Sequence, residues 1–458
     1  MKPIEQSCYW LANRTRDPLP PLEAGCDADI VIVGAGFTGL WTALTLRELE
    51  PGRSVVVLEQ GCAAYGASGR NAGMAGEGID HSHGLAVAHF GEKGAASLAR
   101  LGRRNLDELV EFVASRGIDC DLERNGLLDM ALTPGQVGDL DEVLPIAHRL
   151  GMTHIRRLNR DEAQAELHSD LYQGALLNPR AAILDPVKLV EGLLREADRL
   201  GARIFERTPV VRIERDGAGL RVTTPGGIVR AGRVVLATNA YTHHLVPGLR
   251  RSFLPLYDYV LVSDPLTPEQ RDVIGWRGRQ SVGDARTFFN YYRLTADDRI
   301  LWGTSEAVYY RGDRVDTSCD HSAPHYEALR ASFRRHFPGL ANLEFPYAWG
   351  GPICATTRYT PFFGSLEGGR ILYGIGYTGH GVSSTRLMGR TLAHLAFDRE
   401  MPYPEMQLLG RRPFPYPPEP LRGMVVRWVT RDLRRVDEDG GRSLLLRFLD
   451  AIGVGLSS

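Results

Sequence analysis

The stretch "DIVIVGAGFTGLWTALTLRELEPGRSVVVLEQ", residues 29–60, decides the fold. Its apolar run 30–33 predicts a strand buried on both faces of a parallel sheet. The run enters a GxGxxG motif made by Gly34, Gly36 and Gly39. In this motif the first glycine makes a tight turn, the second lets the backbone approach a pyrophosphate, and the third lets the following helix pack on the strand. We expect that helix to begin near Phe37, with its N–H groups toward the phosphates.

A second apolar strand, predicted over 54–58, ends at Glu59, about 20 residues past the last glycine. A carboxylate at this point can accept hydrogen bonds from both hydroxyls of a ribose. It would also repel a 2′-phosphate, which disfavours NADP. Strand, helix, second strand and terminal acid therefore predict a dinucleotide site, without deciding between a nicotinamide and a flavin.

Two further stretches favour a flavin. The segment "YGASGRNAGM", residues 65–74, combines small residues, which allow close packing on a flat ring, with the donors Ser68, Arg70 and Asn71. The segment "ILYGIGYTGHGVSSTRLMGRTLAHLA", residues 371–396, predicts a strand, a glycine turn and a helix from near Gly381. The start of that helix can stabilise the negative charge of a reduced flavin. Taken singly, the first could be a surface loop and the second an ordinary βα unit.

Composition excludes several classes of function. The 458 residues carry a formal net charge of -1, so no global field draws the chain to nucleic acid. The six cysteines form no CxxC pair, and we expect reduced thiols, a cytoplasmic location and no metal site. No apolar run reaches the roughly 18 residues of a membrane span. A small-molecule partner is expected, and a homo-oligomer stays open.

These motifs together resemble the D-amino-acid oxidase superfamily of FAD-dependent oxidoreductases, and most closely its γ-glutamylputrescine oxidase-like and glycine or sarcosine oxidase-like members. The resemblance rests on GAGFTGL, GASGRNAG, "NPRAAILDPVKLV", "ATNAYTHHLVPGLRR" and GYTGHGV. It implies a mixed α/β fold, with a Rossmann-like FAD domain interleaved with a substrate domain built on an antiparallel sheet. The FAD domain would comprise 27–80, 160–245 and 345–400, and the substrate domain 81–159 and 246–344. A proline-rich linker and C-terminal helices would fill 401–458.

The resemblance also implies which residues contact FAD, with position 211 near the adenine and positions 238 and 239 near the pyrophosphate. These residues are Gly34, Gly36, Phe37, Thr38, Gly39, Glu59, Gln60, Ser68, Arg70, Asn71, Ala72, Val211, Thr238, Asn239, Gly376, Tyr377, Gly379, His380, Gly381 and Val382.

Aromatic and polar residues alternate between about 253 and 313, as in antiparallel strands. The aromatic residues of these strands are candidate walls of a substrate pocket, and we expect two or three of them to line it. They are Tyr257, Tyr259, Phe289, Tyr291, Trp302 and Tyr310.

The implied reaction is oxidation of the C–N bond of a primary or secondary amine by hydride transfer to flavin N5, followed by imine hydrolysis. A polyamine derivative is one such substrate. Oxygen or another acceptor would take the electrons. Desolvation in an apolar pocket lowers an amine's pKa, so no catalytic residue is assigned. A dehydrogenase or oxidase of D-amino or N-methyl-amino acids is one alternative. A non-catalytic flavoprotein, acting as an assembly factor or electron carrier, is another.

Three positions depart from the family pattern. Ile353 stands where glycine oxidase has a carboxylate-binding arginine, and the nearest arginine, Arg358, is five residues on. Leu301 stands where monomeric sarcosine oxidase has an oxygen-activating lysine. Cys354 lies within a residue of the point where sarcosine oxidases attach FAD, but its surroundings differ, and non-covalent FAD is expected.

Overall fold

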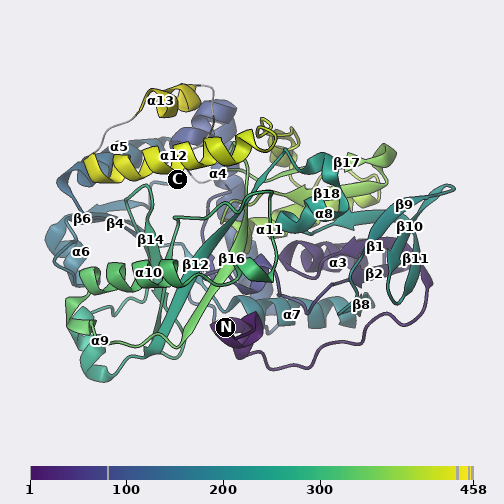
Figure 1. The fold of residues 1–458 in the computed structure, drawn as a ribbon, viewed down its shortest axis with the longest axis horizontal. Coiled ribbons are helices and arrows are strands. Elements are labelled where there is room, and N and C mark those ends of the chain that lie inside the picture. Colours follow the sequence, from purple (N-terminus) through teal and green to yellow (C-terminus); the bar gives the residue numbers. More distant parts are fainter. Residues whose placement is uncertain (1, 80–81, 440–442, 452–453, 455–458) are drawn as a thin grey trace.

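The computed structural model describes residues 2–79, 82–439, 443–451 and 454, and two large sheets lie side by side in it (Figure 1). The first sheet has parallel central strands, as the Rossmann-like pattern predicts. Its order is β17 (Phe362–Leu366), β18 (Ile371–Ile375), β11 (Gly227–Leu236), β1 (Cys26–Val33), β2 (Val55–Leu58) and β8 (Arg203–Phe205), with the hairpin of β9 (Arg212–Asp216) and β10 (Gly219–Thr224) extending from β11.

Three helices pack together beside this sheet, and two of them, α3 and α11, directly follow its strands β1 and β18 in sequence. They are α3 (Phe37–Leu49), α7 (Pro186–Arg199) and α11 (Gly381–Ala396). Helix α7 begins where Asp185 accepts hydrogen bonds from the N–H groups of Val187 (2.8 Å) and Lys188 (3.0 Å). Pro186 occupies its first position, where the missing N–H costs nothing.

The second sheet is antiparallel except for one parallel pair, β13 with β4. Its order is β16 (Tyr347–Ala355), β12 (Leu254–Pro265), β15 (Arg299–Thr304), β14 (Asn290–Leu294), β13 (Ser281–Asp284), β4 (Leu127–Ala131), β6 (Gly174–Asn178) and β5 (Arg156–Leu158). One face packs on α10 (Ala323–His336), and at the β4–β6 end the other face packs on α5 (Pro134–Arg149), which contacts α4 (His83–Ser115).

The predicted fold class is confirmed, but two strands lie elsewhere than the domain boundaries imply. We expected 160–245 and 345–400 to belong wholly to the cofactor domain, yet β6 pairs with β4 and β5, and β16 pairs with β12. Both strands therefore complete the antiparallel sheet. Because strand pairing is long-range, the local sequence does not show which sheet takes up a strand.

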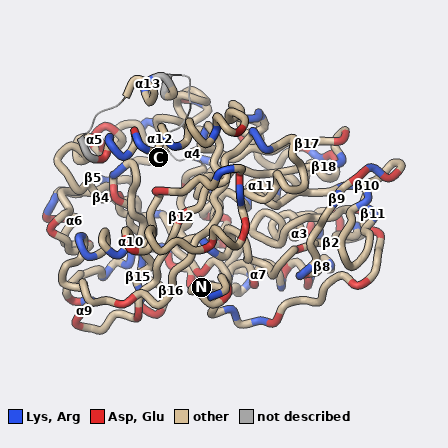
Figure 2. The backbone as a smooth tube through the Cα atoms, viewed as in Figure 1, with Lys and Arg blue, Asp and Glu red and all other residues tan. Residues whose placement is uncertain are grey.

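Smaller elements fill the connections. They are α1 (Ile4–Ser7), α2 (Tyr9–Ala12), α6 (Arg160–Glu166), α8 (Thr242–Leu245), α9 (Pro268–Ile274), and the pair of β3 (Met74–Ala75) with β7 (Ala182–Ile183). After an extended segment, α12 (Leu421–Asp439) crosses the molecule near α5 and α4, and α13 (Leu444–Ala451) follows (Figure 1). Basic and acidic residues are interspersed along the whole chain, as the near-zero net charge implies (Figure 2).

Candidate active site

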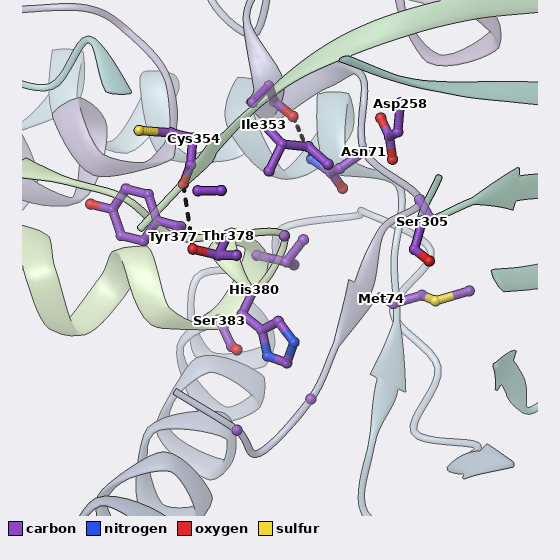
Figure 3. A pocket seen from close by; sticks show the side chains of 18 of the residues that line it. Asn71, Met74, Asp258, Ser305, Ile353, Cys354, Tyr377, Thr378, His380 and Ser383 are labelled. Carbon is purple, nitrogen blue, oxygen red and sulfur yellow. Dashed lines mark hydrogen bonds between the residues drawn. The ribbon is translucent and has the colours of Figure 1, made fainter. Parts of the chain in front are cut away.

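A cavity of about 870 Å³ lies between the ends of the parallel strands and one face of the antiparallel sheet. Its size is within the usual range for small-molecule sites, roughly 300–1,000 Å³. The glycine turn after β1, the end of β2, the loop 64–72, residues 237–241 and the turn before α11 line one part. Residues of β4, β12, β13, β14 and β16 line the other (Figure 3). The cavity therefore joins the predicted cofactor and substrate regions.

The three glycines of the first turn are required by their surroundings. Gly34 has φ +105°, and a Cβ there would lie 2.9 Å from the carbonyl oxygen of Ala237. A Cβ on Gly36 would lie 2.7 Å from the Ser68 Oγ, and one on Gly39 only 1.9 Å from the Gly34 oxygen. Gly34 and Gly36 line the cavity with Phe37 and Thr38, whereas Gly39 lies outside the lining and lets α3 pack on β1.

Glu59 lies in the cavity wall at the end of β2, beside Gln60. Its carboxylate accepts hydrogen bonds from the N–H groups of Ala35 (2.8 Å) and Gly61 (2.9 Å). Burial raises the pKa of this carboxyl, and the two N–H donors oppose the shift. These bonds fix the carboxylate beside the glycine turn, where a ribose is expected.

The turn before α11 is tied to the other cofactor segments. The N–H of Gly376 donates to the Asn239 Oδ1 (3.1 Å), and the hydroxyls of Thr38 and Tyr377 are 2.7 Å apart. Thr378 has a left-handed φ of +47°, and its N–H donates to the Cys354 oxygen (3.0 Å). Such strained backbone is concentrated at functional sites. Gly379, His380, Gly381 and Val382 line the cavity, with Tyr377, Thr238 and Asn239, whereas Gly376 does not.

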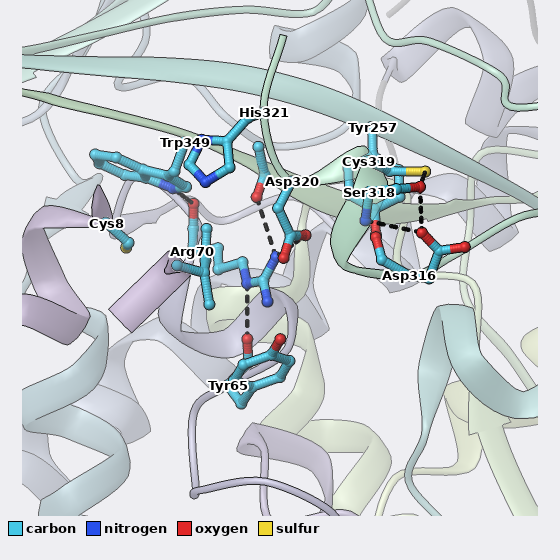
Figure 4. Close-up of polar contacts among 12 residues, drawn as sticks. Cys8, Tyr65, Arg70, Tyr257, Asp316, Ser318, Cys319, Asp320, His321 and Trp349 are labelled. Atoms are coloured by element: carbon cyan, nitrogen blue, oxygen red, sulfur yellow. Dashed lines mark hydrogen bonds and ion pairs between the residues drawn. The ribbon is translucent and has the colours of Figure 1, made fainter. Parts of the chain in front are cut away.

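Arg70 lines the cavity but is largely occupied by protein partners (Figure 4). Its Nη1 donates to the Asp320 Oδ1 (2.5 Å), and its Nε donates to the Tyr65 oxygen (2.8 Å). Its Nη2 is buried and has no hydrogen-bond partner among the described residues. A buried donor without a partner is costly, so a polar ligand in this cavity would satisfy it.

Ser68, Asn71 and Ala72 also line the cavity. The Ser68 Oγ accepts from the N–H of Phe37 (2.9 Å), and the Asn71 amide donates to the oxygens of Ala67 and Ser68 (2.9 Å each). These side chains therefore hold the loop 64–72 against the start of α3.

On the antiparallel sheet, Tyr291 and Phe289 line the cavity, as expected. The Tyr291 hydroxyl donates to the Asp258 Oδ2 (2.6 Å). The tyrosine ring lies over Gly303, where a Cβ would be 2.3 Å from ring carbons. Ile353 and Asp258 come from the neighbouring strands β16 and β12 and also line the cavity (Figure 3).

The other four aromatic candidates do not line the cavity, so two of the six do, within the expected two or three. Side chains alternate between the faces of a strand, and Tyr257, Tyr259 and Trp302 point to the face covered by α10. The Tyr259 hydroxyl bonds to that of Tyr310 (2.5 Å) and donates to the Cys319 oxygen (2.9 Å). Their neighbours in sequence, such as Asp258, take the cavity side.

Two further predicted positions lie outside the lining of the cavity. The side chain of Val211 is 59% exposed and its neighbour Val210 lines the cavity; the expected contact of the adenine with the Val211 backbone stays a prediction. Arg358 lies outside the lining, and its Nη2 donates to the Arg411 oxygen (2.7 Å).

Five acids in the lining were not predicted: Glu77, Asp129, Asp139, Asp258 and Asp284. Asp129 and Asp258 stand out among them. Burial raises the pKa of each to about 6, and for Asp258 the Tyr291 hydroxyl opposes the shift. The signal was present in "LYDYVL" and "LLDMA", where one acid interrupts a strand of otherwise buried residues. A buried acid in such a strand is costly unless it has a partner or a function.

The described ranges contain no group of three or more His, Cys, Asp or Glu side chains that could hold a metal ion. Within the same ranges, no helix is both long and apolar enough to cross a membrane.

Comparison with known proteins agrees with this geometry. The family described as "DAO: FAD dependent oxidoreductase" matches residues 29–395. A probable oxidoreductase OrdL of Haemophilus influenzae is 32% identical, covering 84% of this chain and 86% of the relative. The gamma-glutamylputrescine oxidoreductase of Escherichia coli is 31% identical, covering 89% and 93%.

Among solved structures, glycine oxidase from Geobacillus kaustophilus superposes with a TM-score of 0.70 at 23% identity, covering 85% of this chain and 99% of that one. L-proline dehydrogenase from P. horikoshii gives a TM-score of 0.69 at 20% identity, covering 85% and 98%. At these identities the likeness shows the fold alone. The sequence relatives and the family match carry the assignment further: the chain belongs to the DAO family and is an FAD-dependent oxidoreductase.

Proposed function

We propose that the protein oxidises the C–N bond of a primary or secondary amine to an imine, which water then hydrolyses to a carbonyl compound and a released amine. The observation that carries this proposal is the charge of the cavity. Asp258 presents a carboxylate from the antiparallel sheet, next to the strand that carries Ile353. A carboxylate suits a cationic amine and disfavours a substrate that enters by its own carboxylate.

The arginines in the described part of the lining are each paired with a carboxylate, although the Arg70 Nη2 has no partner. Among the described residues, Arg70 and Arg286 are the arginines in the lining, which contains no lysine. Arg70 pairs with Asp320, and Arg286 pairs with Asp284 through its Nε (2.7 Å) and Nη2 (2.6 Å). Losing a bidentate, desolvated pair with a carboxylate would cost an α-amino acid a factor of about a hundred or more in binding.

Bound FAD would supply the two-electron acceptor, taking a hydride from the carbon beside nitrogen. Gly34, Gly36 and the start of α3 would hold the pyrophosphate, and Glu59 the ribose. Residues 379–382 would face the pyrimidine edge, and the buried Arg70 Nη2 gives the site a donor still to be satisfied. Burial raises the pKa of the Cys354 thiol well above its ordinary value, which disfavours a thiolate and supports non-covalent FAD.

The chain's own residues prepare the amine. Asp258 would bind the substrate ammonium and take its proton, and a carboxyl with a pKa near 6 is suited to that exchange near neutral pH. Tyr291 fixes the orientation of this carboxylate. Apolar side chains of Leu256, Phe289 and Ile353 line the same cavity and exclude water, which favours the neutral amine.

Anaerobic stopped-flow mixing tests the proposal. Putrescine, N-acetylputrescine and an N-alkyl amine should reduce the flavin with second-order rate constants at least about a hundredfold above those of glycine, sarcosine and D-alanine. Faster reduction by the amino acids would favour the amino-acid alternative. A flavin that no compound of either set reduces would favour a non-catalytic flavoprotein.

A further inference from the structure

A second acid faces the cavity on the strand β4. Asp129 pairs in register with Gly283 of β13, Gly283 with Tyr291 of β14, and Tyr291 with Gly303 of β15. Directly paired residues point to the same face of a sheet, so these four positions form one row across the cavity wall. On the next strand, β12, Val260 pairs with Gly303, and Asp258 lies two residues away on the same face, where it accepts the bond from Tyr291.

The two glycines of this row make room for the side chains of their neighbours, and Gly283 lines the cavity. Gly303 leaves room for the Tyr291 ring. The Asp129 Oδ1 lies 3.5 Å from the point where a Cβ of Gly283 would stand, so the carboxylate leans over β13 toward Tyr291. The tyrosine of this wall therefore lies between the two acids.

Asp129 has no hydrogen-bond or ion-pair partner in the described part of the chain, and burial alone accounts for its raised pKa. Its surroundings are apolar: Leu176, paired with it on β6, packs with Leu140 and Ala147 of α5. Arg286, which shares the cavity, is already bound to Asp284. Asp129 is partly buried. A carboxylate without a partner in such an apolar wall is unfavourable, and a bound cation would compensate it.

We propose that Asp129 binds a second cationic group of the substrate while Asp258 holds the amine to be oxidised. This inference rests on the proposed function. Asp129 and Asp258 lie on strands four spacings apart, about 19 Å across the sheet. After a hydrogen bond of about 2.8 Å at each end, at most roughly 13 Å remain between the two nitrogens. Diamines of up to about eight carbons fit within this span.

The test uses the holoenzyme and a homologous series of diamines, from 1,2-diaminoethane to 1,8-diaminooctane, with n-butylamine as the singly charged reference. In anaerobic reduction, the wild type should prefer the best diamine over n-butylamine by about 10–100-fold, as charge-assisted bonds suggest. Asp129→Asn should lower this ratio to near one and flatten the dependence on chain length. Asp139→Asn, which removes an exposed acid of the same lining, should keep the wild-type ratio.

Thermal unfolding gives a second readout. Because Asp129→Asn removes an uncompensated, partly buried charge, its unfolding midpoint should equal or exceed that of the wild type, and Asp129→Ser serves if the asparagine variant does not fold. A diamine preference that persists in the Asp129 variants overturns the inference, as does a wild type that treats diamines and n-butylamine alike. If no amine reduces the wild-type flavin, the proposed function itself has failed.

Discussion

The two faces of the antiparallel sheet carry similar residues and serve different purposes. On the face toward α10, Tyr292 stacks on Trp302 with 4.4 Å between ring centroids, and both are fully buried. On the other face, the adjacent Tyr291 reaches across Gly303 to Asp258 in the cavity. One step along β14 thus separates a residue that stabilises the fold from one that we expect to serve catalysis. On these strands, residue type says less than the face to which the side chain points.

Truncating an aromatic side chain should lower the stability of the protein far more on the α10 face than on the cavity face. Trp302→Ala should lower the free energy of unfolding by about 3–5 kcal/mol, because it leaves a cavity in a packed aromatic core. Phe289→Ala, on the open face, should cost less than half as much. Urea unfolding of the two variants checks the difference. Equal losses would mean that both faces belong to one rigid core.

Variants that remove a charge or a hydroxyl should have the opposite pattern: they should slow flavin reduction on the cavity face and have little effect on the α10 face. Asp258→Asn should slow anaerobic flavin reduction by amines by about 10–150-fold, the equivalent of losing a hydrogen bond to a charged group, about 1.5–3 kcal/mol. Tyr259→Phe, its neighbour on the α10 face, should stay within about threefold of the wild type. If Tyr259→Phe slowed flavin reduction and Asp258→Asn did not, the α10 face and not the cavity face would serve catalysis.

A variant in the cofactor region tests whether FAD binding and the choice among amines depend on separate parts of the molecule. Glu59→Gln removes a charged acceptor, and FAD affinity should fall by about 1.5–3 kcal/mol. At saturating FAD, the order of preference among amines should not change. Titration of the apoprotein with FAD measures the first effect, and stopped flow the second. An unchanged dissociation constant would mean that Glu59 does not hold the ribose.

The smallest expected effect is on pH dependence. A protonated Asp258 cannot hold an ammonium group, so reduction should weaken as the pH falls through about 6. Tyr291→Phe removes the hydroxyl that lowers this pKa, so the midpoint should rise by about one unit, which corresponds to a preference of that hydrogen bond for the charged carboxylate of about 1.4 kcal/mol. The wild type and Tyr291→Phe are measured with the same amine, so the titration of the substrate itself affects both pH profiles equally. A midpoint that stays fixed or falls would contradict the contact.

How far the sequence predicts each region depends on how local its determinants are. Local backbone geometry, within one continuous stretch of sequence, determines the glycines at 34, 36 and 39 and the acid at 59. The antiparallel sheet is different, because both faces of β12 are buried. The sequence does not show which of the two alternating sets of side chains faces the cavity, so it predicts Tyr257 and Tyr259 there, where the structure has Asp258.

Pairing between distant strands set the remaining errors. The membership of β6 and β16 in the antiparallel sheet depends on partners far away in the sequence. Asp129 and Asp258 became recognisable as parts of one wall only through the register of the four strand pairs that join them.

The central claim is that an amine is oxidised in this cavity, and a single anaerobic turnover tests it most directly. Wild-type holoenzyme is mixed with 1,4-diaminobutane, and loss of the oxidised-flavin absorbance is followed together with released ammonia and the aldehyde. The account predicts one ammonia and one aldehyde for each flavin reduced. A flavin that stays oxidised with the diamine, while D-alanine or sarcosine reduces it, would contradict the account.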